Sequence, residues 1–393
     1  MVPDGWMLKS FGEITNIANG QVDPRVEPYC NLPHVGPENV VSGSARVVGV
    51  KSCIELDLIS GKYQFDQHAI VYSKIRPNLN KVCIPGFSGL CSADMYPIWP
   101  KDGVDARFLL QLMLGPEFVG RTTAVSMRTG MPKINRSDLT AIPVRLPPLA
   151  EQQKIAEILS TWDDAITSTE KLLDNSLLQK KALMQKLLNG QLRLQGFHKD
   201  WQVLALGRLF KERVETGKDN LPLLSITTED GVINRNDVGR KDTSNADKSK
   251  YLRICPNDIG YNTMRMWQGV SGLSSQEGIV SPAYTILTPQ AGVDPLFSSY
   301  LFKLPALVHV FYRHSQGMVS DTWNLKYSNF AKIKWLFPAL EEQKAIASVL
   351  LAADKKIQAL RAELACLTQE KKALMQQLLT GKRRVKVDAL EIA

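Results

Sequence analysis

The chain has 393 residues, of which 44% are hydrophobic and 22% are charged, and its formal net charge at pH 7 is +9. This length is sufficient for two or three domains with buried cores. No run of about 18 apolar residues occurs that could cross a membrane. The N-terminal stretch lacks an apolar signal core, so we expect a cytoplasmic protein. Six cysteines without CxxC spacing or paired histidines predict reduced thiols and no metal site.

Residues 1–146 are typical of a globular domain of mixed, mostly β structure. Short β-rich runs at 45–50, 69–72 and 81–84 are separated by Pro, Gly, Asn and Asp, which end strands. The stretch 105–114 has a helical pattern. We therefore expect an α+β domain here.

Residues 147–195 begin with a long helix. Prolines at 147 and 148 and Glu151 in the first turn suit a helix start, and Gly190 suits a left-handed C-terminal cap. An apolar period of 3.5 residues runs through four to five heptads, which predicts the seam of a coiled coil about 60 Å long. Two independent core helices remain the alternative at this point.

The same organisation follows again. Residues 196–336 form a second mixed, mostly β stretch, with β-rich runs at 278–287 and 333–337, a helical pattern at 295–311 and a polar segment at 229–250 that we expect to be a loop. Residues 337–385 carry a second long helix with a cap at Gly381, and residues 386–393 form a short tail.

The two long helices are copies of one another. Residues 147–190 and 338–381 align without a gap at a constant offset of 191, and 19 of the 44 aligned positions are identical. The hexapeptide KKALMQ occurs in both copies, at 180–185 and 371–376. Repetition at a fixed period defines the architecture of a chain, so we expect the two helices to pack on each other in antiparallel orientation.

The globular stretches are related as well, although more remotely. Each contains the pattern Ile-x-Tyr-x-x-x-Arg, which ends at Arg76 in the first and at Arg265 in the second. A Ser-x₇-Pro pattern follows at the same offset of 189, at Ser92 and Ser281. The expected fold is therefore α+β: two mixed, mostly β domains separated by two long helices that pair as an antiparallel coiled coil, with internal pseudo-twofold symmetry.

The sequence shows no sign of catalysis. It lacks the phosphate-binding GxxxxGK[ST] loop, a Gly-rich dinucleotide loop and the Asn/Asp-Pro-Pro-aromatic motif of amino-methyltransferases. Acid-x-Lys triplets similar to nuclease motifs lie inside the predicted helices, and the five histidines are scattered. We expect neither a catalytic residue nor a cofactor nor a metal ion.

Four polar-aromatic segments, which mix Arg, Lys, Asn and Gln with Gly and aromatic residues, are instead typical of DNA binding: 73–81 and 121–136 in the first domain, and 261–269 and 312–326 in the second. Arg and Lys can read guanine, and Asn and Gln can read adenine. A single residue of this kind is more often a solvated loop residue, and Arg76 and Arg265 could hold the fold because both copies keep them. The candidate DNA-binding residues are Lys74, Arg76, Asn78, Asn80, Lys81, Arg121, Arg128, Lys133, Asn135, Arg136, Asn262, Arg265, Gln268, Arg313, His314, Gln316, Asn324 and Lys326.

These features together resemble the specificity subunits of Type I restriction-modification enzymes over essentially the full chain. The resemblance rests on the Pro-x-Leu-x-Glu-Gln helix openings at 147–152 and 338–343, the KKALMQ helix ends, SKIRPNLNKV at 73–82 and VSPAY at 280–284. The second domain departs from the IRP pattern and has MRMW at 264–267.

The resemblance implies that 1–146 and 196–336 are target recognition domains, and that 147–195 and 337–385 are the central and C-terminal conserved regions. It also implies a non-catalytic subunit that binds double-stranded DNA at a bipartite, asymmetric site. Its partners would be two methylation subunits, docked on the helices, and restriction subunits. The alternatives are a coiled-coil scaffold with non-specific nucleic-acid affinity and a self-contained restriction or methylation enzyme, which would need a motif that this sequence lacks.

Overall fold

The computed structural model of the chain describes residues 2–127, 132–227, 231–239, 247–318 and 322–387. These residues form two compact units. Unit 1 comprises residues 1–171 and 361–393, and unit 2 comprises residues 172–360. Each unit therefore contains one globular domain and a part of each long helix.

The globular part of unit 1 is built on two four-stranded sheets, with strand orders β2-β9-β6-β7 and β4-β3-β8-β5, and a ribbon of β1 and β10. All pairs are antiparallel except β3 with β8. The strands are β1 (Met7–Ser10), β2 (Thr15–Ile17), β3 (Pro33–Val35), β4 (Lys51–Ser52), β5 (Tyr63–Phe65), β6 (Ile70–Ser73), β7 (Val82–Cys83), β8 (Gly89–Cys91), β9 (Met95–Pro100) and β10 (Pro143–Leu146). The helices are α1 (Phe11–Ile14), α2 (Ala106–Leu114), α3 (Pro116–Ser126) and α4 (Arg136–Thr140), with short 3₁₀ helices η1 (Tyr29–Asn31), η2 (Pro37–Asn39) and η3 (Pro77–Leu79).

Unit 2 repeats part of this plan. Its sheets are β12-β19-β16-β17, β13-β14, β15-β18 and the ribbon β11-β20. The strands are β11 (Gln202–Ala205), β12 (Phe210–Glu212), β13 (Leu224–Ile226), β14 (Val232–Asn234), β15 (Leu252–Ile254), β16 (Ile259–Asn262), β17 (Ser271–Leu273), β18 (Gly278–Val280), β19 (Tyr284–Pro289) and β20 (Lys334–Phe337). The helices are α6 (Leu206–Leu209), α7 (Pro295–Leu301), α8 (Pro305–His314) and α9 (Tyr327–Phe330), with 3₁₀ helices η4 (Arg235–Val238) and η5 (Met266–Gln268).

The two long helices are α5 (Leu149–Leu187) and α10 (Leu340–Leu378), each 39 residues long. Their predicted starts and caps are confirmed, since Gly190 and Gly381 have φ angles of 75° and 70°. Only glycine adopts this left-handed conformation without a steric cost. The expected helix at 295–311 is interrupted between α7 and α8, and the expected strand at 45–50 is wrong because this stretch forms only an isolated bridge at Val47.

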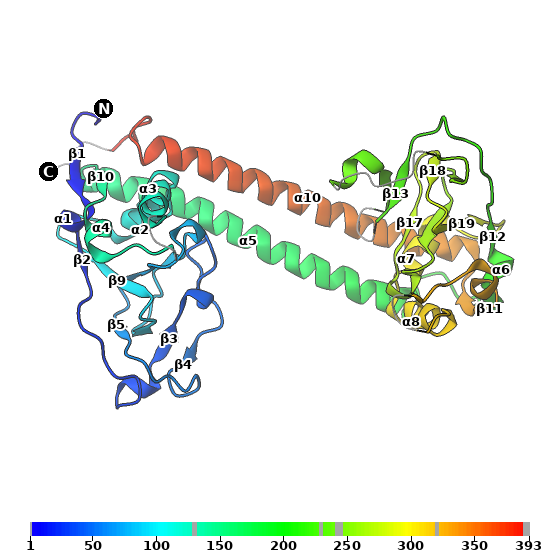
Figure 1. Cartoon of the computed structure of the whole chain (residues 1–393), viewed down its shortest axis with the longest axis horizontal. Coiled ribbons are helices and arrows are strands. Elements are labelled where there is room, and N and C mark those ends of the chain that lie inside the picture. The colour runs from blue at the N-terminus through cyan, green and yellow to red at the C-terminus, as the bar shows by residue number, and fades with distance from the viewer. Residues whose placement is uncertain (1, 128–131, 228–230, 240–246, 319–321, 388–393) are drawn as a thin grey trace. The chain divides into compact units, whose positions relative to one another are not determined.

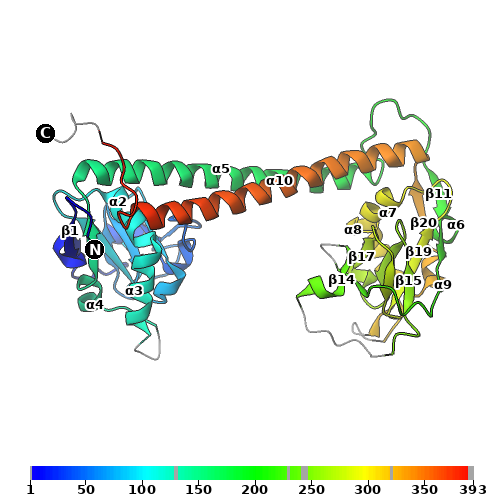
Figure 2. The ribbon, with the colours of Figure 1, turned by 90° about the horizontal axis from the view of Figure 1, so that it is seen from above.

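In unit 1 the start of α5 and the end of α10 lie side by side next to α2 and α3 (Figures 1 and 2). Both segments contribute to one hydrophobic core: Ile155 and Leu159 from α5 and Met375 and Leu378 from α10 join residues of the globular domain such as Phe118. Burial of apolar surface is the main force that joins such elements. The helices are therefore part of the domain's core.

Polar contacts set the relative position of these segments. Lys371 on α10 is buried and donates to Asp163 on α5 over 2.5 Å, and Gln111 on α2 donates to the second oxygen of the same carboxylate over 2.7 Å. Further along, Arg384 binds Glu151 at the start of α5. As α5 advances from residue 151 to 163, its partners recede from 384 to 371, so the two segments run in opposite directions in this unit.

Unit 2 contains the same set of contacts at the repeat-related positions. Lys180 on α5 donates to Asp354 on α10 over 2.5 Å, and the hydroxyl of Tyr300 donates to the same carboxylate over 2.7 Å. Arg193 binds the buried Glu342 through two nitrogens, at 2.5 and 2.8 Å. The sequence repeat is therefore also a repeat of polar contacts.

The glutamine of each Glu-Gln helix opening fastens the helix to its domain. The amide of Gln152 donates to the carbonyl oxygens of Gly103 and Pro147, and its side-chain oxygen accepts from the backbone N–H of Asp105 over 2.9 Å. Gln343 makes the equivalent three bonds in unit 2. A buried amide with all these partners satisfied holds one orientation, which explains why the motif occurs in both copies.

We predict that Asp163→Ala destabilises the protein by about 2–3 kcal/mol, because the buried ammonium of Lys371 loses its counter-ion. Chemical denaturation followed by circular dichroism measures this loss. Glu363→Ala, which removes an exposed carboxylate on the same helix as Lys371, is the control and should change the free energy of unfolding by less than about 0.5 kcal/mol. Equal effects of the two substitutions would contradict a role for the Asp163–Lys371 pair.

Candidate nucleic-acid interface

The two polar segments predicted in the first domain lie side by side in unit 1. The backbone N–H of Arg76 donates to the carbonyl oxygen of Pro132 over 2.8 Å, and that of Ile134 donates to Lys74 over 2.9 Å. Ile75 and Lys133 form an antiparallel bridge between these two bonds. Segments about 60 positions apart in the sequence therefore form one surface.

The turn after β6 has an unusual backbone that determines which side chains face outward. Arg76 and Asn80 both have a φ angle of 47°, on either side of η3. Non-glycine residues rarely adopt this left-handed conformation, which is characteristic of functional turns. Asn80 is held there by a 3.0 Å hydrogen bond from its amide to the carbonyl oxygen of Leu114, and Asn78 at the centre of the turn is exposed.

Several of the predicted DNA-binding residues of unit 1 are engaged within the domain instead. Arg136 donates to the carbonyl oxygens of Ile17 and Ala18 and lies over the ring of Tyr96. Burial, together with the nearby charge of Lys133, lowers the pKa of the Lys74 ammonium, which is only 9% exposed. Lys81 and Asn135 are also engaged within the domain: Lys81 donates to the carbonyl oxygen of Pro37, and the side chain of Asn135 caps α4.

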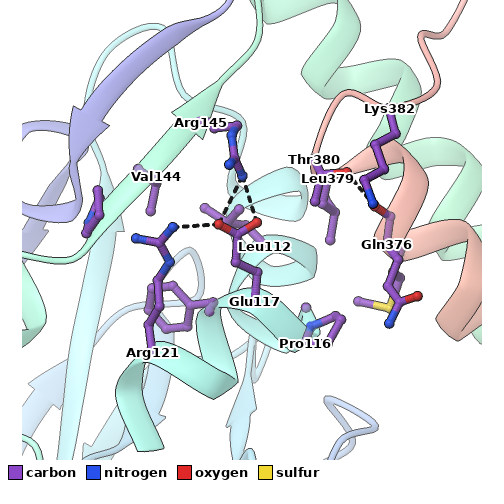
Figure 3. A pocket seen from close by; sticks show the side chains of 14 residues that line it. Leu112, Pro116, Glu117, Arg121, Val144, Arg145, Gln376, Leu379, Thr380 and Lys382 are labelled. Atoms are coloured by element: carbon purple, nitrogen blue, oxygen red, sulfur yellow. Dashed lines mark hydrogen bonds and ion pairs between the residues drawn. The ribbon is translucent and has the colours of Figure 1, made fainter. Parts of the chain in front are cut away.

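Arg121 is likewise occupied, in a pocket of about 410 Å³ in unit 1. Figure 3 shows Arg121 and Arg145 directed at the carboxylate of Glu117, which they contact at 2.6 and 2.7 Å. Partial burial opposes ionisation of Glu117, but the two arginines outweigh it and lower the pKa of this carboxyl. The pocket is also lined by Met375 and Gln376 of α10 and by Leu379, which directly follows α10. Arg121 therefore supports the domain where this helix packs against it.

Three predicted residues of unit 1 remain available to a ligand. The side chains of Arg76, Asn78 and Lys133 are exposed and make no hydrogen bond or ion pair among the described residues. Arg128 lies outside the residues that the structure describes. The exposed side chains of this surface thus supply two cations and one amide.

The second domain brings its two predicted segments together in the same way. The backbone N–H of Leu325 donates to Thr263 over 2.8 Å, and Gln316 and Asn324 form an antiparallel bridge that closes the loop between them. The 3₁₀ helix η5 follows β16, as η3 follows β6 in unit 1. The hydroxyl of Tyr261 donates to the carbonyl oxygen of Leu325 over 3.0 Å and supports the arrangement from the core.

Two of the predicted residues in these two segments have side chains that stabilise local turns. Asn262 accepts from the backbone N–H of Met264, and Asn324 donates to the carbonyl oxygens of Gln316 and Thr322. The remaining six side chains are exposed: Arg265, Gln268, Arg313, His314, Gln316 and Lys326. Arg265 contacts Gln268 only at 3.4 Å, so both stay accessible.

Sequence reasoning did not single out a cluster of aromatic residues at this surface. The ring centroids of Trp267 and Trp323 lie 5.3 Å apart, and those of Tyr312 and Trp323 lie 4.9 Å apart, both in edge-to-face geometry. These letters are visible in the two polar segments, but they are far apart in the sequence. Only the backbone pairing of the segments shows that they form one group.

The surface offers hydrogen-bond donors, cations and aromatic rings, which are groups suited to binding nucleic acid. Among the described residues, no group of three or more His, Cys, Asp or Glu side chains is placed to hold a metal ion. The described helices also include none that is long and apolar enough to cross a membrane.

Comparison with known proteins gives a consistent picture. Residues 3–177 match the family model described as the Type I restriction modification DNA specificity domain. The chain is 38% identical over 190 residues to the Type I restriction enzyme EcoDI specificity subunit of Escherichia coli, a match that covers 48% of this chain and 41% of that protein. It is 26% identical to the MjaVIII specificity subunit of Methanocaldococcus jannaschii over 98% of this chain and 94% of the relative.

A solved structure extends the likeness to the whole fold. The S subunit of a Type-I restriction-modification system from M. genitalium superimposes with a TM-score of 0.60 at 14% identity, over 95% of this chain and 96% of the other. Two globular domains of mixed helix and sheet, together with two long helices, are thus shared with a specificity subunit. Residues 3–177 thus match the Type I DNA specificity domain, and the chain as a whole is similar to the specificity subunits of Type I restriction-modification enzymes.

Proposed function

We propose that the two globular domains each read one half of an asymmetric, bipartite DNA site. In this proposal residues 1–146 and 196–336 are the target recognition domains, and residues 147–195 and 337–385 are the connecting conserved regions, followed by the tail 386–393. The observation that carries it is the pair of turns at repeat-related positions, η3 and η5, which carry different side chains. Asn78 occupies the position of Trp267, while Arg76 and Arg265 correspond. Turns at repeat-related positions that present different side chains to the bases suit two unlike half-sites.

The long helices would then act as the spacer between the half-sites. The opposite direction of their segments within each unit, the repeated Lys–Asp pairs and the 3.5-residue apolar period support an antiparallel coiled coil with pseudo-twofold symmetry. Their exposed faces would dock two methylation subunits, one for each repeat, and restriction subunits would join that complex. The chain itself would be non-catalytic, with neither cofactor nor metal.

The bipartite reading is tested by selecting binding sites from a random duplex DNA library, with the subunit alone and with its methylation subunits. We expect two short unlike motifs at a fixed separation. Asn78→Ala should relax the first motif only, and Gln268→Ala the second only, each by about 1–3 kcal/mol of discrimination. Salt-sensitive retention without an enriched motif would instead indicate a basic coiled-coil scaffold with non-specific affinity.

A second test separates phosphate contact from support of the fold. Lys133→Ala should weaken binding to all DNA sequences alike and reduce the salt-dependence slope by about 1, because it removes one phosphate contact. Arg136→Ala should instead lower the stability of the first domain by about 1–3 kcal/mol, since the carbonyls of Ile17 and Ala18 lose their donor. Titrations at several salt concentrations and thermal melts distinguish the two. The same salt slope in Lys133→Ala and the parent protein would remove Lys133 from the interface.

The spacer role predicts a change of site geometry. One heptad inserted after Leu173 in α5 and one after Leu360 in α10 keeps the apolar seam and adds about 10 Å. The preferred separation of the two motifs should increase by about three base pairs, at 3.4 Å each. Insertion into α5 alone is the control and should lower stability without producing the longer spacing. An unchanged separation in the double insertion would refute the spacer role.

A further inference from the structure

The aromatic cluster of unit 2 is held in place by contacts with the surrounding structure. We refer to Trp267, Tyr312 and Trp323 as the aromatic triad. Trp267 lies in η5, Tyr312 lies in the last turn of α8, and Trp323 lies in the segment that is hydrogen-bonded to the turn after β16. The indole N–H of Trp267 donates to the carbonyl oxygen of Met264 over 2.9 Å, and the ring of His309 stacks on Tyr312 at 5.8 Å. The rings are thus held in fixed orientations.

The triad is separate from the hydrophobic core, which has its own aromatic residues. Phe302, Phe311 and Phe330 pack on one another and are fully buried. Tyr312, in contrast, is 40% exposed and the neighbouring Met264 is 48% exposed. Both tryptophans are half-buried. Exposed large apolar groups gathered at one place indicate a surface that contacts a partner.

The charges around the triad indicate which partner this is. The exposed side chains of Arg265, Arg313 and Lys326 come from the same two segments. Across residues 259–276 and 301–327 the sequence contains one carboxylate, Asp321, which lies outside the described residues. Cations around aromatic rings match a polyanion that has planar, stackable groups. Duplex DNA has both properties.

The first domain lacks a counterpart to the triad. The shared offset of 189 places Asn78 opposite Trp267 and Thr123 opposite Tyr312, counted from the prolines that start α3 and α8. The backbone bonds from Ile134 to Lys74 and from Leu325 to Thr263 place Pro132 opposite Trp323. The triad therefore occurs at positions where the two repeats differ in sequence, whereas the backbone pairing of the two segments occurs in both.

We infer that the second recognition domain reads its half-site partly through DNA deformation, with the aromatic triad acting as a wedge against one unstacked base step. This rests on the proposed function. Apolar side chains that enter a duplex unstack and kink it at a cost that depends on the step, lowest for pyrimidine–purine steps such as TA and CA. The triad would therefore give specificity at a position that no hydrogen bond reads, whereas the first domain would rely on Asn78 and its cations.

The test uses the full specificity subunit assembled with its methylation subunits and the selected duplex site. 2-Aminopurine is placed in turn at each position of the second half-site, because its fluorescence rises when a base unstacks. We expect a rise at one step on binding, and its loss in Trp267→Ala and Trp323→Ala together with a 5- to 100-fold loss of affinity. A single mismatch at that step should strengthen binding by the parent protein and should not strengthen binding by the variants.

The controls are Val203→Ala and Leu336→Ala, which remove apolar side chains that are 63% and 42% exposed elsewhere in unit 2. They should leave both fluorescence and affinity unchanged. If an alanine variant fails to fold, Trp323→Leu keeps an apolar side chain at this position and removes the ring. Thermal melts of every variant identify a purely supporting role, in which stability falls while the fluorescence rise persists.

Three outcomes would overturn the inference: no unstacked step in the parent protein, a rise that survives loss of the tryptophans, or loss of methylation-subunit binding with DNA affinity intact. The last would mean that the triad docks a protein. Failure of the proposed function is a different result, namely a library selection without paired motifs. A bipartite motif without an unstacked step would leave the proposed function standing and refute the wedge alone.

Discussion

A buried carboxylate at the start of each long helix holds the architecture together. Glu151 is 7% exposed and Glu342 is 1% exposed, and each accepts from a tryptophan at the entrance of a globular domain and from an arginine beyond the end of the other helix. A charge in such a place is tolerated only when it is paired and hydrogen-bonded. Glu151 therefore brings together three segments that are distant in the sequence, whereas Glu342 brings together two, because Arg193 and Trp201 belong to the same stretch after α5.

In unit 1 this requirement joins the two ends of the chain. Arg384 reaches Glu151, and it also donates to the carbonyl oxygen of Asp4 over 2.7 Å, so the segment after α10 is bound to the segment before β1. In unit 2 the same role falls to Arg193, in the middle of the chain, which donates to the carbonyl oxygen of Lys199. Equivalent contacts thus join the segment after α10 to the N-terminal segment in unit 1, and the segment after α5 to the start of the second domain in unit 2. This equivalence agrees with the sequence repeat.

The surface proposed to read DNA has the same backbone arrangement in both units. A turn after the strand β6 or β16 is fastened by backbone hydrogen bonds to a second segment, so the outward side chains can change without disturbing the fold. This separation explains how two related domains can present different chemistry. It also explains why Arg136, Asn80 and Lys74, which resemble reading residues in the sequence, prove to be engaged inside the domain.

The sequence by itself determined the plan of the chain. Periodicity, caps and a gapless repeat located both long helices and predicted their ends to within a few residues, because helix signals are local and dense in α5 and α10. The family resemblance rested on motifs whose physical reason, such as the three hydrogen bonds of Gln152, became visible only in the structure.

Only the tertiary structure decided which polar residues are free. The sequence does not show whether an arginine binds a carbonyl oxygen, as Arg136 does, or faces water, as Arg76 does, because the partner of Arg136 lies more than a hundred residues away in the sequence. The aromatic triad depends on the pairing of two separated segments, which no local pattern records. Local signals determine elements, whereas the grouping of side chains on a surface depends on contacts between segments that are distant in the sequence.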